Sequence, residues 1–493
     1  MASTATRRGQ APKLASYASS SSVSTSETPS IVGSLAASEK SSSTSLSSMG
    51  SDEETKKGAL IDTFGNEFEL PNFTIKDIRD AIPPHCFERS YLRSYGYVLR
   101  DLVCLATTFY IFHNYTPLIQ SYPLRCAAWA LYTVLQGLFA TGIWVLAHEC
   151  GHGAFSPSKL VNDLTGCVLH SALLVPYFSW KISHSKHHKA TGHMERDMVF
   201  VPKTRQEYMS KINSTALTLA ELGEETPIAT ALNMILQQLF GWPLYLITNI
   251  TGHNCHERQS EGRGKGKENG WFNGVNHFNP SSPLYEKKHA HLIIYSDIAL
   301  TVSGFLLYLG IQKFGFTNML VWYFIPYLWV NHWLVAITFL QHTDPTLPHY
   351  YPEAWNFTRG AAATIDREFG FIGRQLLHGI IETHVLHHFV SSIPFYNADE
   401  ATEAIKPVMG KHYRSDTKGG SFGFLKAIWT CFRWCNFAEV CEGAEGEGKY
   451  VLFFRNRNGL GIPPRKDEDV LREAKDPKAT GKAAIVDLLD DSD

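Results

Sequence analysis

The sequence predicts an all-α integral membrane protein with four transmembrane helices and a cytosolic helical cap that carries a histidine-rich site. Two observations predict this fold class. Apolar stretches recur along the chain, and several approach the roughly 20 residues that a helix needs to cross a membrane. Three histidine clusters, HECGH at 148–152, HSKHH at 184–188 and HVLHH at 384–388, have the spacing of residues that share one helix face.

The two ends of the chain differ in composition from its centre. Residues 1–58 are dominated by Ser, Thr and Ala, with too few large apolar side chains to offset the entropy of ordering, so we predict a disordered Ser/Thr-rich tail. An organelle transit peptide is the alternative, because Arg7 and Arg8 precede every acidic residue, but the apolar face of such a peptide is missing. We expect a membrane domain over 59–440 and a flexible, charged C-terminal tail over 441–493. The net charge of -2 indicates no nucleic-acid partner.

Four apolar stretches are the predicted spans. The first is short and crosses only if it extends through Ile119, the second is interrupted only by Gln136, and the last two form a hairpin. Residues 164–180 are also apolar, but His170 and Pro176 interrupt them, so an interfacial segment is expected there. The mostly polar stretch 181–290 contains a glycine-rich basic run, which we interpret as a cytosolic loop. The spans lie at about 99–119, 126–147, 295–313 and 318–340.

An even number of spans returns all three histidine clusters to one face of the membrane and places both termini there. The expected outer connections, 113–125 and 313–317, carry only Arg125 and Lys313, whereas 181–290 and 403–480 are rich in lysine and arginine. Because positive loops stay inside, we expect the histidine face and both termini to be cytosolic.

The histidine clusters predict a metal site. A single histidine is more often a hydrogen-bonded residue than a ligand, but two HxxHH clusters and an HxxxH pair are difficult to explain by packing. Neutral imidazole suits zinc, copper, iron and nickel. Eight histidines exceed the four ligands of one tetrahedral ion, so two ions are expected. A histidine-rich pair of ions at a membrane face favours iron used for oxygen activation, since acid–base chemistry cannot remove hydrogen from an unactivated methylene.

Two other functions were weighed against this one. HECGH satisfies HExxH, the zinc motif of many metalloproteases, but that interpretation leaves most histidines of the other clusters without a role. We expect Glu149 to hold an imidazole N–H instead. A metal transporter would need more polar or charged residues within its spans than the sequence shows.

The order of HECGH, HSKHH and HVLHH, the four spans and the wide gap before the last cluster closely resemble the membrane-bound acyl-lipid fatty-acid desaturases, especially fungal delta-12 (oleate) desaturases. The resemblance covers about residues 59–435. It implies a di-iron oxidoreductase of the endoplasmic reticulum membrane that uses O2 to place a cis double bond in oleoyl chains of membrane phospholipids, giving linoleoyl. Oleate 12-hydroxylases and delta-12/delta-15 bifunctional desaturases share the clusters and remain alternatives.

The resemblance also implies partners and ligands. The electrons come from cytochrome b5 and its reductase, as a separate protein because no HPGG haem motif occurs here. One further ligand lies between the second and third clusters, and we favour His342 over His332, which is deeper in the last span. Four nearby carboxylates could orient ligands or lie at the surface: Glu195, Asp197, Asp344 and Glu382. The implied iron ligands are His148, His152, His184, His187, His188, His342, His384, His387 and His388.

Overall fold

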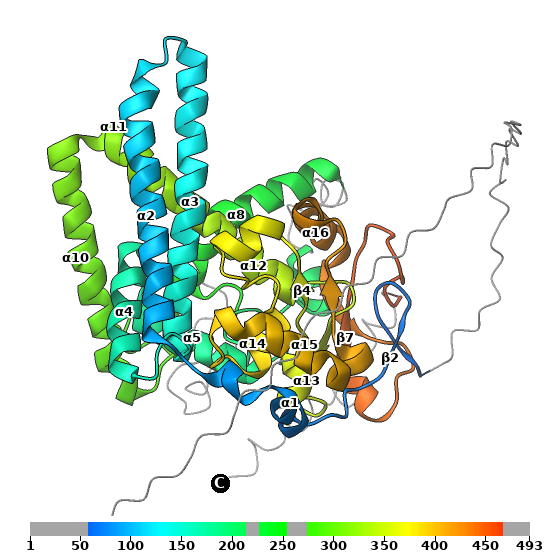
Figure 1. Cartoon of the computed structure of the whole chain (residues 1–493). Helices are drawn as coiled ribbons and strands as arrows, with labels where there is room; N and C mark the ends of the chain where they lie inside the picture. The colour runs from blue at the N-terminus through cyan, green and yellow to red at the C-terminus, as the bar shows by residue number, and fades with distance from the viewer. Residues whose placement is uncertain (1–57, 213–225, 254–273, 467–493) are drawn as a thin grey trace, which may run out of the picture. The chain divides into compact units, whose positions relative to one another are not determined.

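The computed structural model describes residues 58–212, 226–253 and 274–466, and this part of the chain is mostly helical (Figure 1). The predicted N-terminal tail and the basic run at 261–268 lie outside it. The helices are α1 (Ile75–Ala81), α2 (Tyr91–Tyr115), α3 (Tyr122–His152), α4 (Lys159–Ala172), α5 (Tyr177–Ala190), α6 (Arg205–Ile212), α8 (Pro227–Thr248), α10 (Ala290–Phe314), α11 (Phe316–Met319), α12 (Ile325–His342), α13 (Phe357–Ala361), α14 (His384–Phe389), α15 (Ala398–Met409) and α16 (Gly420–Trp434). The strands are β1 (Leu60–Ile61), β2 (Glu67–Phe68), β3 (Pro348–Tyr350), β4 (Asp366–Arg367), β5 (Ser415–Asp416), β6 (Phe437–Val440) and β7 (Val451–Arg455).

Three helical stretches among the described residues are long and apolar enough to cross a membrane: Tyr122–His152, Lys287–Phe314 and Phe316–His342. They contain the last three predicted spans. The first predicted span, 99–119, falls on α2, which is 25 residues long but carries Arg93, Arg100 and Asp101 in its first half. These charges lower its hydropathy, so α2 is not among the three.

The long helices form two hairpins whose turns lie at the same, upper end in Figure 1. One turn joins α2 to α3, and the other joins α10 to α11 at Gly315, which has a φ of 84° that glycine tolerates. The segment from Phe316 continues through a π-helical turn into α12. The ends of α3 and α12 that carry histidines therefore both lie away from the hairpin turns.

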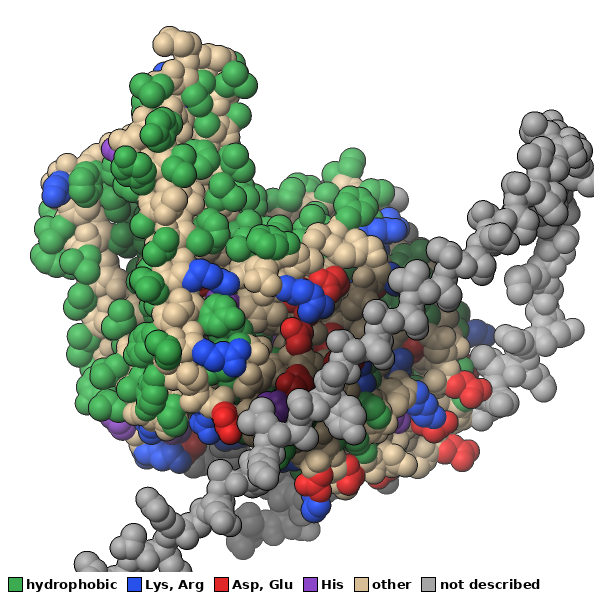
Figure 2. Space-filling model, in the orientation of Figure 1, with side chains coloured by type: hydrophobic (Ala, Val, Ile, Leu, Met, Phe, Trp, Pro, Cys, Tyr) green, Lys and Arg blue, Asp and Glu red, His purple; other side chains and the backbone are tan. Residues whose placement is uncertain are grey.

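Burial separates the inner helices from the outer ones. The most apolar part of α3 is 72% buried, because it packs between α2, α4 and α12, whereas that of α10 is only 11% buried. Figure 2 shows hydrophobic side chains covering the exposed faces of α2, α3 and α10, while most charged side chains in this view are spread over the lower and right-hand parts of the molecule. Such an apolar band beside a charged body is typical of a membrane protein.

The all-α prediction missed a small sheet. Strands β3, β7 and β6 pair in that order, all antiparallel, and β4 pairs with β5 in parallel. Strand β7 is entirely buried, so the flexible tail predicted over 441–493 is wrong for the residues up to 466, and the rest lies outside the described part. The acidic and basic residues at 442–449 concealed the short apolar run that forms β7.

Helix α8 was not predicted from the sequence and lies within the stretch interpreted as mostly polar. This 22-residue helix contains no Asp, Glu, Lys or Arg and packs against α12 and α16. It was overlooked because polar residues on both sides dominate the average over 181–290.

Candidate metal centre

The first two histidines of the site project from the end of α3. His148 and His152 are one turn apart, and the helix stops at Gly153, whose left-handed φ of 72° makes it a C-terminal cap. The HECGH cluster is therefore the last turn of a largely buried helix, which fixes where its side chains point.

The other two clusters also lie on helices. HSKHH occupies the last half of α5, and HVLHH forms most of the six-residue α14. As the spacing predicted, each helix directs its three histidines to the same site. His342 is the last residue of α12 and joins them from a fourth element.

The nine predicted histidines meet in one mostly buried cluster, which we call the histidine centre. One group brings together His148, His152, His184, His188 and His387, and a second brings together His187, His342 and His388, each with possible ligand atoms within 4.8 Å of one another. His384 adjoins the second group, with its Nε2 3.2 Å from that of His342 and 3.0 Å from that of His388.

The contacts between the rings do not form a network of hydrogen bonds. The Nε2 atom of His148 lies 3.0 Å from that of His184 and 3.2 Å from that of His152. His342 likewise has two such contacts, to His187 at 3.3 Å and to His384 at 3.2 Å. Each nitrogen of a neutral imidazole is either a donor with one proton or an acceptor with one lone pair, so one Nε2 cannot form hydrogen bonds with two other ring nitrogens at once. Nitrogens converging in this way fit ligands arranged around ions.

Burial and proximity keep the imidazoles in the form that binds metals. Burial, together with neighbouring imidazoles, holds the pKa values of His184, His188 and His388 well below the ordinary value, and the same causes act on His384 and His387. These rings are neutral near pH 7. The Nε2 of His387 is buried and has no hydrogen-bond partner among the described residues.

Two polar side chains orient imidazole rings by bonding the Nδ1 atoms of His187 and His388. Asp197 is buried, and its Oδ1 lies 2.7 Å from His187 Nδ1, which places the proton on that nitrogen and leaves Nε2 facing the centre. Thr191 donates its hydroxyl proton to the carbonyl of His187 at 2.8 Å, so it accepts from His388 Nδ1 at 3.0 Å. Asp197 was one of four carboxylates that the sequence left open as orienting or surface groups, whereas Thr191 was not predicted, although it follows His187 by one helical turn.

The other carboxylates considered from the sequence do not hold a histidine. The nearest oxygen of Glu149 is 3.7 Å from His148 Nδ1, too long for a hydrogen bond, and its other oxygen accepts from Phe395 N at 3.1 Å. Asp344 pairs with Arg367, and Glu382 accepts from Phe369 N. Glu195 is half-buried, and among the described contacts it bonds none of the nine histidines.

Of the two candidates for the ninth ligand, only His342 lies in the histidine centre. His332 is ten residues earlier on α12, where its ring contacts those of Trp329 and Trp333. It is half-buried and lies among aromatic side chains.

Comparison with known proteins identifies the family. Residues 126–419 match the fatty acid desaturase family, and residues 16–108 match a domain of unknown function. The chain belongs to the fatty acid desaturase family. It is 62% identical over 455 residues to an oleate hydroxylase of Claviceps purpurea, covering 91% of this chain and 94% of the relative. It is 47% identical over 384 residues to a delta(12) fatty acid desaturase of Mortierella alpina, covering 76% of this chain and 90% of the relative.

Membership of this family confirms the predicted resemblance and makes the chain a membrane-associated oxidoreductase of lipid metabolism. It argues against the metalloprotease and transporter alternatives. Desaturase-family enzymes use iron, and the histidine centre is able to bind metal. The converging Nε2 atoms of these histidines suit iron binding, because imidazole is a good ligand for iron.

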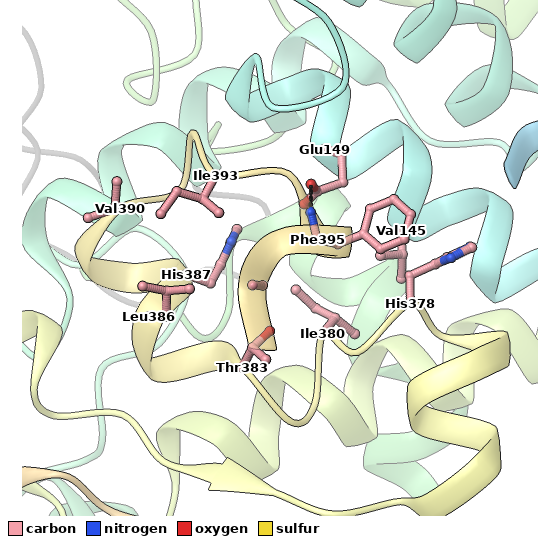
Figure 3. A pocket seen from close by; sticks show the side chains of 11 residues that line it. Val145, Glu149, His378, Ile380, Thr383, Leu386, His387, Val390, Ile393 and Phe395 are labelled. Atoms are coloured by element: carbon pink, nitrogen blue, oxygen red, sulfur yellow. Dashed lines mark hydrogen bonds between the residues drawn. The ribbon is translucent and has the colours of Figure 1, made fainter. Parts of the chain in front are cut away.

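A pocket of this desaturase-family chain reaches the histidine centre (Figure 3). Most of its walls are apolar, with Val145 on α3 and Ile380, Leu386 and Ile393 around α14. His387 supplies a wall of the pocket, and it is the residue whose Nε2 has no hydrogen-bond partner. The pocket therefore gives the histidine centre a mostly apolar wall on this side.

Proposed function

We propose that the chain holds two iron ions in the histidine centre and uses O2 to oxidise the delta-12 position of oleoyl chains in membrane phospholipids. The observation that carries the proposal is the convergence of nine histidines beside a mostly apolar pocket. The nine residues proposed as ligands are His148, His152, His184, His187, His188, His342, His384, His387 and His388.

Two outcomes of this oxidation are compatible with the site. Hydroxylation and desaturation share the first hydrogen removal and differ only in the second step. The 62% identity to an oleate hydroxylase, against 47% to a delta(12) desaturase, favours 12-hydroxylation over the desaturation that the sequence analysis preferred. Desaturation stays the second candidate because several relatives at 40–47% identity are desaturases.

Bound iron would supply the O2-dependent oxidising power that an unactivated methylene requires. The chain's own residues do the rest. Helices α3, α5, α12 and α14 hold the imidazoles in place, and Asp197 and Thr191 hold protons on the ring nitrogens that face away from the centre. The apolar wall at Val145 and Ile380 limits the access of water to the histidine centre.

We further propose that α2 is the fourth span, so that the helical cap with the histidine centre and both termini lie in the cytosol of an endoplasmic reticulum membrane protein. The support is the exposed apolar surface of α2, including Leu92, Leu99, Leu102 and Tyr110, beside the three more apolar stretches. Cysteine-accessibility labelling of intact microsomes tests this. A cysteine at Lys189 should react from the cytosolic side, and reaction only after permeabilisation would refute the orientation.

Cytochrome b5 is the proposed electron donor, acting as a separate protein with its reductase. Exposed Lys189 and Arg196 follow the second histidine cluster in the sequence and could meet an acidic donor. Replacing both with glutamine should lower the rate of electron transfer from cytochrome b5 and leave the iron content unchanged. An unchanged rate would refute this docking surface.

The activity is tested by expressing the chain in a host that makes oleate but no linoleate, followed by fatty-acid analysis. A 12-hydroxy product supports hydroxylation, and 18:2 supports desaturation. The variant His387→Ala is the matched control and should give neither product and a lower iron content. An unchanged lipid profile from the wild-type chain with bound iron would refute both activities.

A further inference from the structure

We propose that Asp366 and Arg367, the two residues of strand β4, are positioning residues that hold the third histidine cluster and His342 at their correct separation. The inference rests on the proposed function of the histidine centre. Among the described hydrogen bonds, neither side chain bonds an imidazole ring of the nine histidines. Both are 1% exposed, so their polar atoms are buried and need hydrogen-bond partners among neighbouring groups.

Asp366 anchors the start of α14. This helix has no side-chain cap of its own, because Thr383 at the N-cap position makes no such bond. Asp366 on strand β4 supplies the missing cap, because its Oδ1 accepts a hydrogen bond from the Val385 N–H at 2.7 Å. Its Oδ2 accepts from the hydroxyl of Tyr413 at 2.5 Å, which fixes the carboxylate. The position of His384, next to Val385, therefore depends on Asp366.

Arg367 anchors the end of α12. Its Nε donates to the carbonyl of Leu340 at 2.9 Å, and one terminal nitrogen contacts Asp344 Oδ2 at 2.8 Å. These two acceptors lie on either side of His342 in the sequence. The other terminal nitrogen bonds Asp416 Oδ2 at 2.8 Å, on the strand paired with β4. The planar fork of an arginine suits this division among three acceptors, whereas a lysine ammonium could not reach all of them.

The two anchors act on histidines that meet. Successive side chains of a strand point to opposite faces, so Asp366 reaches α14 while Arg367 reaches α12. The Nε2 atoms of His342 and His384 are 3.2 Å apart. The backbone adds to the link, since Arg367 N donates to the carbonyl of Ile381 at 3.0 Å, three residues before His384. Strand β4 thus connects the two elements directly behind this pair of histidines.

The test is an anaerobic titration of the iron-depleted, purified full-length chain with ferrous iron, together with its Mössbauer spectrum. Asp366→Ala should weaken iron binding by about tenfold or more, the range found when groups behind metal ligands are removed. Asp366→Asn should stay within about twofold of wild type, because asparagine accepts a helix N–H as well as aspartate does. If Asp366→Ala is not recovered folded, Tyr413→Phe replaces it and should lie between these two.

Arg367→Lys should also lose about tenfold or more in iron affinity. The matched control is Arg455→Lys, because Arg455 is also buried and bonds the carbonyls of Ile61 on β1 and Phe454 on β7, away from the histidine centre. It should bind iron within about twofold of wild type. The inference would be overturned if Asp366→Ala and Arg367→Lys bound iron as tightly as wild type. It would also be overturned if Arg455→Lys lost as much iron affinity as Arg367→Lys. A wild-type chain that binds no iron would instead overturn the proposed function, and this inference with it.

Discussion

Replacing Asp197 with asparagine should weaken iron binding about 10- to 100-fold, the usual effect of removing a carboxylate behind a ligating histidine. Asp197 Oδ1 accepts from His187 Nδ1 at 2.7 Å, and backbone N–H groups of Val199 and Gly192 hold the carboxylate at 2.9 and 3.2 Å. Asparagine fits the same space but loses the charge that fixes the His187 proton. At about 1.4 kcal/mol per tenfold, the loss is roughly 1.4 to 2.8 kcal/mol of binding free energy.

The assay is iron retained per chain after equilibration against graded concentrations of a ferrous chelator. Glu195→Gln is the matched control, since it removes a carboxylate two residues away that bonds none of the nine histidines in the described contacts. The control should follow the wild-type curve. Equal curves for Asp197→Asn and wild type would refute the reasoning, because the hydrogen bond to His187 would then have no influence on the centre.

Two further predictions concern packing and the ninth ligand. A methyl group added at Gly166 on α4 would lie 2.3 Å from the ring of Tyr177 on α5, so Gly166→Ala should destabilise the fold by about 1–3 kcal/mol and lower the melting temperature. The control is Gly304→Ala, because nothing lies within 4 Å of a methyl group added there. Equal melting temperatures for the two variants would contradict the prediction. His342→Ala should lose iron and product whereas His332→Ala keeps both, and the reverse pattern in iron analysis would show that the wrong histidine was chosen.

The histidine centre was predictable because its signal is local. The spacings within HSKHH and HVLHH fix one face of a short helix, whatever the rest of the fold does. His342 was predictable from the resemblance and from its place at the end of an apolar stretch. Asp197 could be proposed because it follows His187 by ten residues, but only its 2.7 Å contact separates it from surface carboxylates such as Glu195.

Other parts of the structure have no local signal. Asp366 reaches Val385 across 19 residues, and nothing in the sequence around either residue indicates that they meet. Strand β7 pairs with β3 about 100 residues away, so a five-residue apolar run between charged segments gave no reason to expect a sheet. Helix α8 had a signal, its 22 residues without charge, but averaging over a long polar region concealed it.

Iron stoichiometry tests the central claim most directly. The purified wild-type chain, loaded anaerobically with ferrous iron and freed of excess metal, should contain two iron ions per chain by elemental analysis. Its Mössbauer spectrum should show nitrogen-rich iron, and the variant His387→Ala should contain less. One ion per chain, or iron content that does not change in His387→Ala, would contradict a centre in which nine histidines hold two iron ions.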